Sequence, residues 1–446
     1  MIDARWFRLV YPVVVLFTLL AGDAWRYTIG WFGWAALVLV LAGFGIALLV
    51  RNRGRWAFGR LPYPMLAFLL LATVSTAWSF YPGATALGAA ALLVTATGAL
   101  AIAVSFSWRE LLAALGLAVR FILGLSFLFE LYVSVIYRGP ILPLVPEPGI
   151  DYSKLDKVPK MLYWSRDELF DVLHGGKIQG IVGNSVLLSF VALIGIILFA
   201  LELGGRTHKK RWALPWLVLA LLALAFSRSA TIIAALVVVT LVACAVLLVR
   251  RARTAKARAI TYGSILGVVA IGVAVVLVFH KQFLSVLGKS EDFTGRFDIW
   301  ATVIHLAQQR PVFGWGWVSQ WVPWVAPFDT LVFRNGVRQL HAHNAWIDMW
   351  FQLGIVGLVV FGALVISTLA RSWTLAVDRP QAAAKAPLPY RVESLLPLLV
   401  LTALLVQSVA ESKLLVEFGM LFLIVIAVKT KAPDRPLETV RSQSRD

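Results

Sequence analysis

Residues 230–249 form one uninterrupted apolar stretch, ATIIAALVVVTLVACAVLLV, between Arg228 and Arg250. A helix needs about 20 apolar residues to cross a hydrocarbon core of about 30 Å. The stretch has this length and carries no charge, so it predicts a transmembrane helix. Cys244, the one cysteine of the chain, lies inside it, which excludes a disulfide framework, a cysteine zinc site and cysteine redox chemistry.

The composition extends this prediction to the whole chain. Of the 446 residues, 60% are hydrophobic and 14% are charged, whereas soluble domains have about 45–50% apolar and about 25% charged residues. A soluble globular enzyme is therefore excluded. The 18 Trp residues are typical of membrane–water interfaces. The net charge of +18 is explained by basic residues that hold loops in the cytoplasm, and we expect no nucleic-acid partner.

Eleven further apolar stretches predict an all-α integral membrane protein with about 12 transmembrane helices. The predicted spans are 7–22, 30–50, 64–80, 83–106, 110–136, 181–203, 212–227, 230–249, 260–280, 343–370, 392–411 and 415–429.

The basic residues predict the orientation, because loops rich in Lys and Arg stay in the cytoplasm. Of the 41 Lys and Arg residues, the short outer loops hold only Arg26, Arg228 and Lys413. Both termini are therefore expected inside and two large loops outside. The expected division is 1–136 (helices 1–5), 137–180 (first outer loop), 181–280 (helices 6–9), 281–342 (second outer loop) and 343–446 (helices 10–12 and a cytoplasmic tail).

Arg228 is the first candidate site residue. Residues 211 and 250 mark two basic clusters about 58 Å of helix apart, roughly twice a bilayer core, so the sequence between them turns near residue 230 at the outer face. An Arg at this turn opposes the positive-inside tendency. It is either a helix-end Arg that reaches water or an anion clamp, because guanidinium binds phosphate oxygens through two parallel donors.

The two large outer loops have room for a water-facing site. In the second loop, residues 294–311 predict a helix with Thr294 as its N-cap and Pro311 just past its end. Arg296 would lie in its first turn, where backbone N–H groups favour an anion, although a solvated surface Arg has the same sequence pattern. In the first loop we expect a short helix around residues 165–173.

His341-Ala-His343-Asn344 precedes the tenth span. A His at an outer helix start can act as a general base, since its ordinary pKa is near 6.5, or it can be merely interfacial. The i, i+2 spacing is poor for a metal on a helix, and no carboxylate cluster accompanies the pair, so we expect neither a metal nor another cofactor. Further polar residues within spans should face the bundle interior, with roles left open. They are Arg120, Glu130, Asp348, Gln352, Glu411 and Glu417.

These motifs, in this order, resemble the O-antigen ligase and polymerase superfamily of bacterial membrane proteins. The ligase signature is His, then Asn, Ser or Gln, nine residues, Gly, two residues, and Gly, Thr or Tyr. Here His343-Asn344, nine residues and Gly354-Ile-Val-Gly357 fit it. The stretches 295–316 and 226–229 also resemble the family, with weaker similarity at 77–82 and 180–184.

The resemblance implies a GT-C-like architecture and an inverting, metal-independent glycosyltransferase of the bacterial cytoplasmic membrane, with its active site on the outer face. The donor would be a glycan on undecaprenyl diphosphate, and the acceptor a hydroxyl of a glycolipid, glycan or protein. His343 would be the general base and Arg228 and Arg296 would bind the diphosphate. Supporting residues would be Asn344, His341 and Asn184.

Two alternatives stay open. A polymerase of the same superfamily would join lipid-linked repeat units, and the full ligase signature favours a ligase over it. A flippase or transporter of lipid-linked glycans would carry charges deep in a central cavity. Arg120 and Glu130 are the residues that would fit this alternative.

Overall fold

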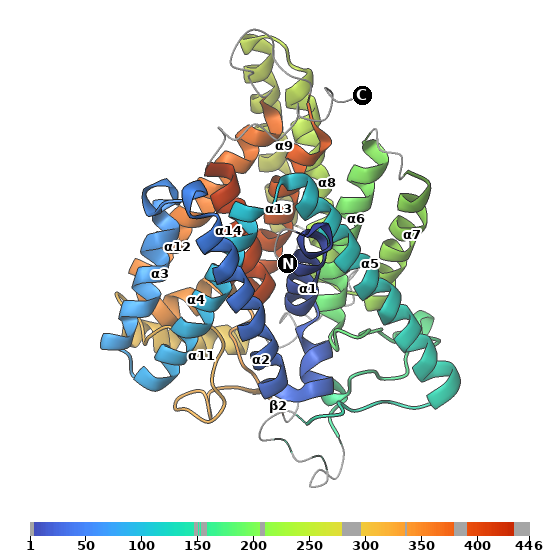
Figure 1. The fold of residues 1–446 in the computed structure, drawn as a ribbon, viewed down its shortest axis with the longest axis vertical. Helices are drawn as coiled ribbons and strands as arrows, with labels where there is room; N and C mark the ends of the chain where they lie inside the picture. The colour runs from blue at the N-terminus through green and yellow to red at the C-terminus, as the bar shows by residue number, and fades with distance from the viewer. Residues whose placement is uncertain are drawn as a thin grey trace.

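The computed structural model describes residues 4–146, 150, 152, 158–205, 210–278, 296–334, 337–378 and 390–431, and Figure 1 shows their arrangement. Within these residues the chain forms thirteen α-helices and one short β-hairpin. The helices are α1 (Arg5–Leu20), α2 (Gly22–Arg51), α3 (Tyr63–Val74), α4 (Pro82–Ser105), α5 (Trp108–Tyr132), α6 (Ser185–Gly204), α7 (Lys210–Ser227), α8 (Ala230–Arg251), α9 (Ala255–Val278), α11 (Arg296–Gln309), α12 (Ala345–Val377), α13 (Leu396–Ser408) and α14 (Glu417–Lys431). The strands are β1 (Phe333–Arg334) and β2 (Val337–Arg338), paired antiparallel.

Each of the twelve predicted spans overlaps one of these helices, and α11 is the additional one. Within the described residues, six helices are long and apolar enough to cross a membrane, namely α2, α4, α5 with the π-turn that follows it, α6, α8 and α12. The protein is therefore a multi-pass α-helical membrane protein. The full count of twelve crossings and the GT-C-like architecture stay predictions.

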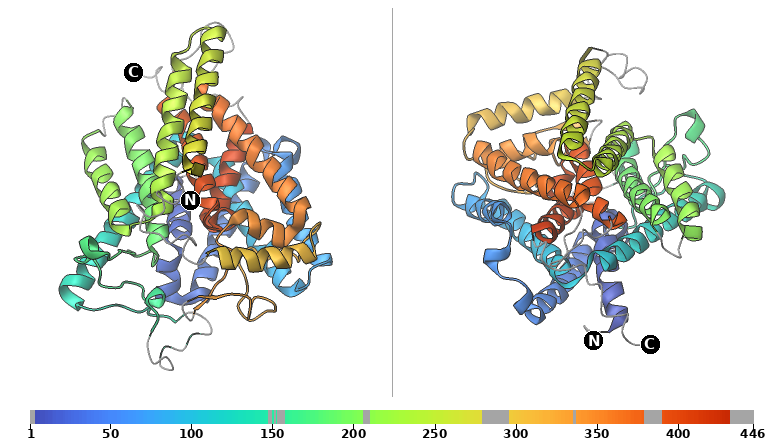
Figure 2. Two further views of the ribbon diagram at one scale, coloured as in Figure 1. Left: turned by 180° about the vertical axis from the view of Figure 1, so that it is seen from behind. Right: turned by 90° about the horizontal axis from the view of Figure 1, so that it is seen from above.

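The core is built around the C-terminal helices. Nearly every residue of α13 and α14 is buried, and the view from above places these helices at the centre of the bundle (Figure 2). α4, α1 and α12 pack against α14, while α8 packs against α13. By contrast, α8 and α9 expose many Leu, Ile and Val side chains, as expected of helices that face lipid.

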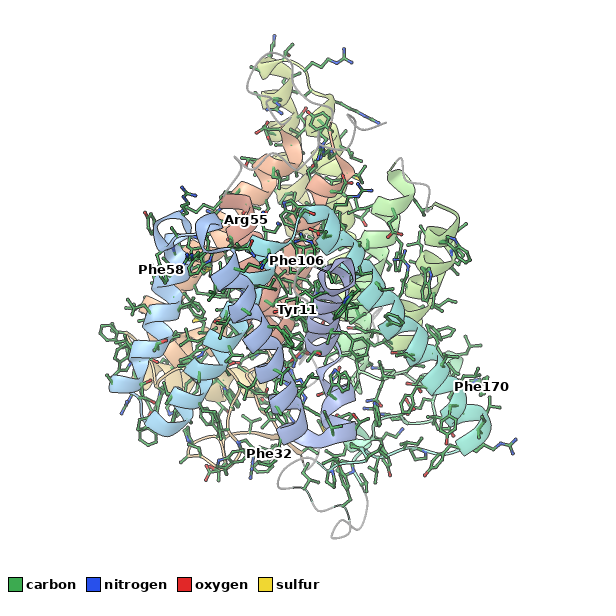
Figure 3. All side chains as sticks on the ribbon, in the orientation of Figure 1. Tyr11, Phe32, Arg55, Phe58, Phe106 and Phe170 are labelled. Atoms are coloured by element: carbon green, nitrogen blue, oxygen red, sulfur yellow. The ribbon has the colours of Figure 1, made fainter. Side chains whose placement is uncertain are left out.

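The described parts of the two large loops lie at one end of the bundle. In Figure 1 the described residues of the first loop (teal) and α11 are both at the lower end, whereas the α2–α3 and α8–α9 connections are at the upper end. The side-chain view agrees, with Phe170 low and Arg55 high (Figure 3). This arrangement separates the large loops from the basic connections, as the charge pattern requires.

The signature glycine Gly354 breaks α12, with φ +66. A break exposes backbone groups that must find new partners, and residues 311–316 of the second loop supply them. Trp315 and Gly316 donate to the carbonyls of Phe351 and Gln352, and Ile355 and Val356 donate to the carbonyls of Pro311 and Val312, over 2.8–3.1 Å. A Cβ on Gly354 would lie 2.2 Å from the Val312 carbonyl oxygen, so this approach requires glycine.

The short helix expected around residues 165–173 is absent from the described residues there, which form turns and one 3-10 turn, Val172–His174. The reason is that the Ser165 and Glu168 side chains bind distant groups instead of capping a helix. Thr294, the expected N-cap of α11, lies outside the described residues.

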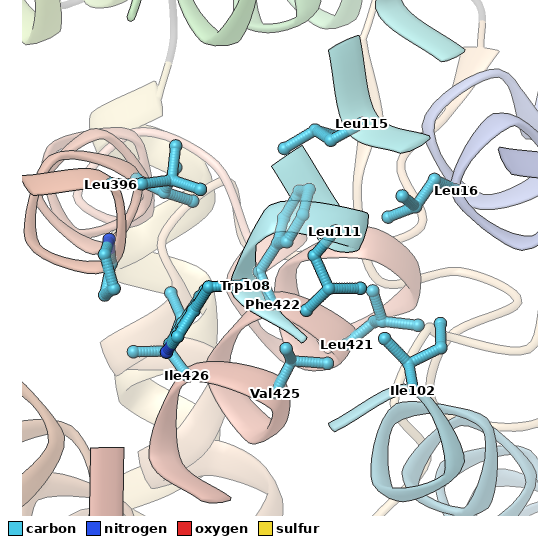
Figure 4. A pocket seen from close by; sticks show the side chains of 12 residues that line it. Leu16, Ile102, Trp108, Leu111, Leu115, Leu396, Leu421, Phe422, Val425 and Ile426 are labelled. Atoms are coloured by element: carbon cyan, nitrogen blue, oxygen red, sulfur yellow. The ribbon is translucent and has the colours of Figure 1, made fainter. Parts of the chain in front are cut away.

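One pocket lies between α1, α4, α5, α13 and α14 (Figure 4). Its walls are apolar, and Leu16, Trp108 and Phe422 are among the lining residues. Such a lining offers no acid, base or anion-binding group. The chemistry must therefore be sought among the polar residues at the loop end.

Candidate functional site

His343, Arg296 and Glu411 meet where the second large loop reaches the start of α12. The His343 Nδ1 lies 3.2 Å from Glu411 Oε2, and the Arg296 guanidinium donates to Glu411 Oε1 over 2.8 Å. His341 Nε2 is 3.9 Å from the same carboxylate. The exposed fractions are 16% for His343, 14% for Arg296 and 10% for Glu411, so this cluster is shielded but not sealed from solvent.

Glu411 is an anion in this setting. Burial by itself would raise the pKa of Glu411, but the neighbouring His343, which hydrogen-bonds the carboxylate, and then His341 and Arg296 lower it to about 2. Burial, followed by the neighbouring His343, lowers the pKa of His341 well below 6.5, so His341 is neutral at pH 7. The cluster thus holds a permanent carboxylate beside a permanent guanidinium and an uncharged imidazole.

Gln339 contacts the other ring nitrogen of His343. Its Oε1 lies 3.0 Å from His343 Nε2, while its Nε2 donates to the Val337 carbonyl. The imidazole therefore lies between two acceptor oxygens, one from Gln339 and one from Glu411. This environment satisfies both N–H groups of a protonated ring, so it suits a residue that gains a proton.

Asp348 joins the three chain segments that carry the cluster. Its carboxylate is buried in α12 and accepts hydrogen bonds from Trp321 Nε1 (2.9 Å), the Ala342 backbone N–H (3.0 Å) and Ser412 Oγ (2.6 Å). These donors come from the second loop, the segment before α12 and the turn that contains Glu411. One buried acceptor thus fixes all three segments relative to one another.

Asn344 caps α12, because its Oδ1 accepts from the backbone N–H groups of Trp346 and Ile347. Its Nδ2 donates to the Val409 carbonyl, 3.1 Å away, which anchors the Glu411 turn to the helix start. Asn184 has the same capping role at α6, and among the described residues no hydrogen bond or ion pair joins it to the cluster. Both side chains therefore cap helices, and their supporting role in the site stays a prediction.

Arg228 lies in the turn between α7 and α8, as expected. Its guanidinium donates to the Val172 carbonyl of the first loop over 3.0 Å. Within the described ranges no hydrogen bond or ion pair joins Arg228 to His343, Arg296 or Glu411. The two predicted diphosphate-binding residues therefore sit on different loops, and their shared role stays a prediction.

His343 and Arg228 share an uncommon backbone conformation. Their φ angles are +52 and +51, in the left-handed region that residues with a Cβ rarely adopt. Such strain persists only where the surroundings enforce it, and it is concentrated at functional sites. Arg138, Asp167, Ser319 and Glu417 also have positive φ angles, so the conformation by itself does not distinguish these two positions.

His341, His343 and Glu411 each offer one metal-ligand atom, and these atoms lie within 4.8 Å of one another. The expectation that no carboxylate accompanies the histidine pair is therefore wrong, because Glu411 is 68 residues away in sequence and adjacent in space. Arg296 binds the same carboxylate, and its positive charge opposes a further cation. The geometry favours a base with its orienting acid over a metal centre.

The sequence indicated Glu411 and Asp348 only as costly polar residues within spans, and it gave no signal for Gln339.

Arg120 and Glu130, the two residues that would fit a transporter, bind structural partners instead. Arg120 pairs with Glu202 at 2.6 Å. Glu130 accepts from Ser165 Oγ and from two backbone N–H groups at 2.7–2.8 Å, which anchors the first loop to α5.

The fold and the cluster define a multi-pass helical membrane protein with an acid–base pair beside an arginine. Residues 215–362 match the family model described as O-antigen ligase, a segment that includes Arg228, Arg296 and His343. This match covers about a third of the chain, and it confirms the resemblance seen in the sequence. The family implies a membrane glycan ligase or polymerase that uses a lipid-linked donor. None of the curated proteins matches the chain.

Proposed function

We propose that this protein is an inverting, metal-independent glycosyltransferase that moves a glycan from undecaprenyl diphosphate to an acceptor hydroxyl. The transfer would take place at the outer face of the bacterial cytoplasmic membrane. The observation that carries the proposal is the convergence of His343 and Arg296 on Glu411. This convergence supports a base and an anion-binding group that act at one point of the loop end.

His343 would accept the proton of the acceptor hydroxyl as its oxygen attacks C1 of the first sugar. Glu411 would hold the ring and stabilise the imidazolium that forms, since its ionised oxygen already faces Nδ1. Gln339 would be displaced from Nε2 when the acceptor binds. Because the acceptor attacks opposite the leaving group in one displacement, the configuration at C1 is inverted.

The diphosphate leaves with the electron pair of the sugar–phosphate bond, so negative charge grows on its oxygen. Arg228 and Arg296 would stabilise that charge in place of a divalent metal. Arg296 has a donor available, because its buried Nε–H has no partner in the described part of the chain. A buried donor without an acceptor is what a phosphate oxygen would satisfy.

The test compares lipid-linked glycans in bacterial cells that carry either wild-type protein or the His343→Ala variant and lack any other copy of the gene. His305→Ala is the matched control, because His305 is exposed on α11 away from the cluster. We expect His343→Ala to accumulate full-length polymer on undecaprenyl diphosphate, with His305→Ala unchanged. Accumulation of single repeat units would instead identify a polymerase. An unchanged profile with normal membrane levels of His343→Ala would refute the proposed base.

A further inference from the structure

Asp348 of α12 binds the chain neighbours of both His343 and Glu411. Its Oδ2 accepts hydrogen bonds from the Ala342 backbone N–H over 3.0 Å and from Ser412 Oγ over 2.6 Å. Ala342 directly precedes the proposed base in the sequence, and Ser412 directly follows the carboxylate that faces the base. One buried oxygen atom therefore joins the two chain segments that carry this pair.

The Ala342 peptide also connects these segments to α11. Its carbonyl accepts from Trp300 Nε1 over 3.0 Å, and Trp300 lies about one helical turn after Arg296. Asp348 is 0% exposed and Ser412 is 3% exposed, so water does not compete for these hydrogen bonds. The bonds thus hold the buried side of the cluster and leave its partly exposed side open to a substrate.

The contact between His343 and Glu411 depends on the position of the Glu411 turn. Nδ1 and Oε2 are 3.2 Å apart, at the upper end of the N–H···O range of about 2.7–3.2 Å. An outward movement of the turn would therefore break this hydrogen bond. Misplacement of a reacting group by about 1 Å can lower a rate about 100-fold. The Ser412 hydroxyl restrains the turn at the residue next to Glu411.

We infer that Asp348 and Ser412 are positioning residues that hold Glu411 against His343 during glycan transfer. The inference rests on the proposed function, since it requires His343 to act as the base. Neither positioning side chain contacts the substrate or moves a proton. Their effect on the reaction passes through the position of the Glu411 carboxylate. If their bonds only stabilised the bundle, the loss of one would lower stability and leave the chemical step unchanged.

The test is a double-mutant cycle in the full-length protein in nanodiscs, with the lipid-linked donor and the acceptor extracted from cells that lack the gene. The cycle compares wild type, Ser412→Ala, Glu411→Gln and the double variant. Ser412→Ala should lower kcat about 5- to 50-fold with little change in KM, because substrate contacts are intact. In the Glu411→Gln background the same substitution should change kcat less than about 2-fold, since the contact that it positions is already lost.

Ser408→Ala is the matched control. Ser408 is a serine with 1% exposure at the end of α13, and its Oγ accepts from Trp346 Nε1 of α12 over 3.0 Å. It therefore joins the same two helices without a bond to Asp348. We expect Ser408→Ala and Ser412→Ala to unfold at lower temperature than wild type, and only Ser412→Ala to lose kcat. Ser412→Cys replaces Ser412→Ala if the latter does not fold, because a thiol fills the space and is only a weak donor.

A loss of kcat in Ser412→Ala that disappears in the Glu411→Gln background and is absent from Ser408→Ala supports the inference. Wild-type kcat in Ser412→Ala, or an equal loss in Ser408→Ala, would overturn it. The same fold-loss from Ser412→Ala in both backgrounds would overturn it too. If Glu411→Gln is slow while Ser412→Ala is normal, the inference fails and the proposed function stands. If wild type transfers no glycan, both fail.

Discussion

Glu411→Gln tests whether the carboxylate orients the base or only holds the fold. Glutamine has the shape of glutamate but cannot carry its charge. Glu411 makes one hydrogen bond with His343 and one with Arg296, and hydrogen bonds to charged groups are each worth about 1.5–3 kcal/mol. Loss of the His343 bond acts on the transition state, where the imidazolium forms. The expected decrease in kcat is therefore about 10- to 150-fold.

Loss of the Arg296 bond lowers the stability of the fold. The Arg296 side chain is only 14% exposed, and the substitution leaves its guanidinium without a counter-charge. Removing one partner of a buried pair costs about 3–5 kcal/mol. Glu417→Gln is the matched control. Glu417 is 11% exposed, like Glu411 at 10%, and pairs with Arg26 at 2.8 Å and Lys413 at 3.2 Å, but among the described residues it does not contact His343.

The assay is transfer from a purified lipid-linked donor in detergent, with thermal unfolding followed by intrinsic fluorescence in the same samples. We expect both variants to unfold at lower temperature and only Glu411→Gln to lose kcat beyond that effect. A Glu411→Gln protein that transfers glycan at the wild-type rate would show that the carboxylate is purely structural. A decrease in kcat of the same size in Glu417→Gln would refute the reasoning equally.

Three further predictions follow from the same geometry. The pKa of Glu411 falls from 4.5 to about 2 on folding, so its contribution to stability is complete above pH 4.5 and is lost as the pH falls toward 2. The difference in unfolding temperature between wild type and Glu411→Gln should therefore shrink over that pH range. A difference that stays constant would contradict this prediction. EDTA should leave transfer unchanged, whereas activity lost in EDTA and restored by Mg²⁺ or Mn²⁺ would refute the two-arginine mechanism. Gly354→Ala should abolish folded protein, because the added Cβ would lie 2.2 Å from the Val312 carbonyl oxygen. The control Gly362→Ala should fold, since a Cβ at that position has nothing within 4 Å. Normal expression of both variants would contradict our explanation of the helix break.

The local features of this protein could be predicted from its sequence. The positions of the helices follow from runs of apolar residues. The turn at Arg228 follows from the spacing of basic clusters. Val303 and Ala307 follow Arg296 at helical spacing, and both are buried. Each of these depends on neighbours within a few turns of the chain.

The composition of the site was decided by the tertiary structure. Glu411 reaches His343 across 68 residues because α12, α13 and α14 pack together, and Asp348 holds Ser412 and Trp321 to the same helix. Hydrophobicity determines which segments enter the membrane. It does not determine which polar side chains at the helix ends come into contact after the helices have packed. That choice depends on helix packing and on satisfying buried polar groups. The sequence alone therefore predicted the helices, their orientation and His343 as the candidate base, whereas only the fold brought Glu411 to its side.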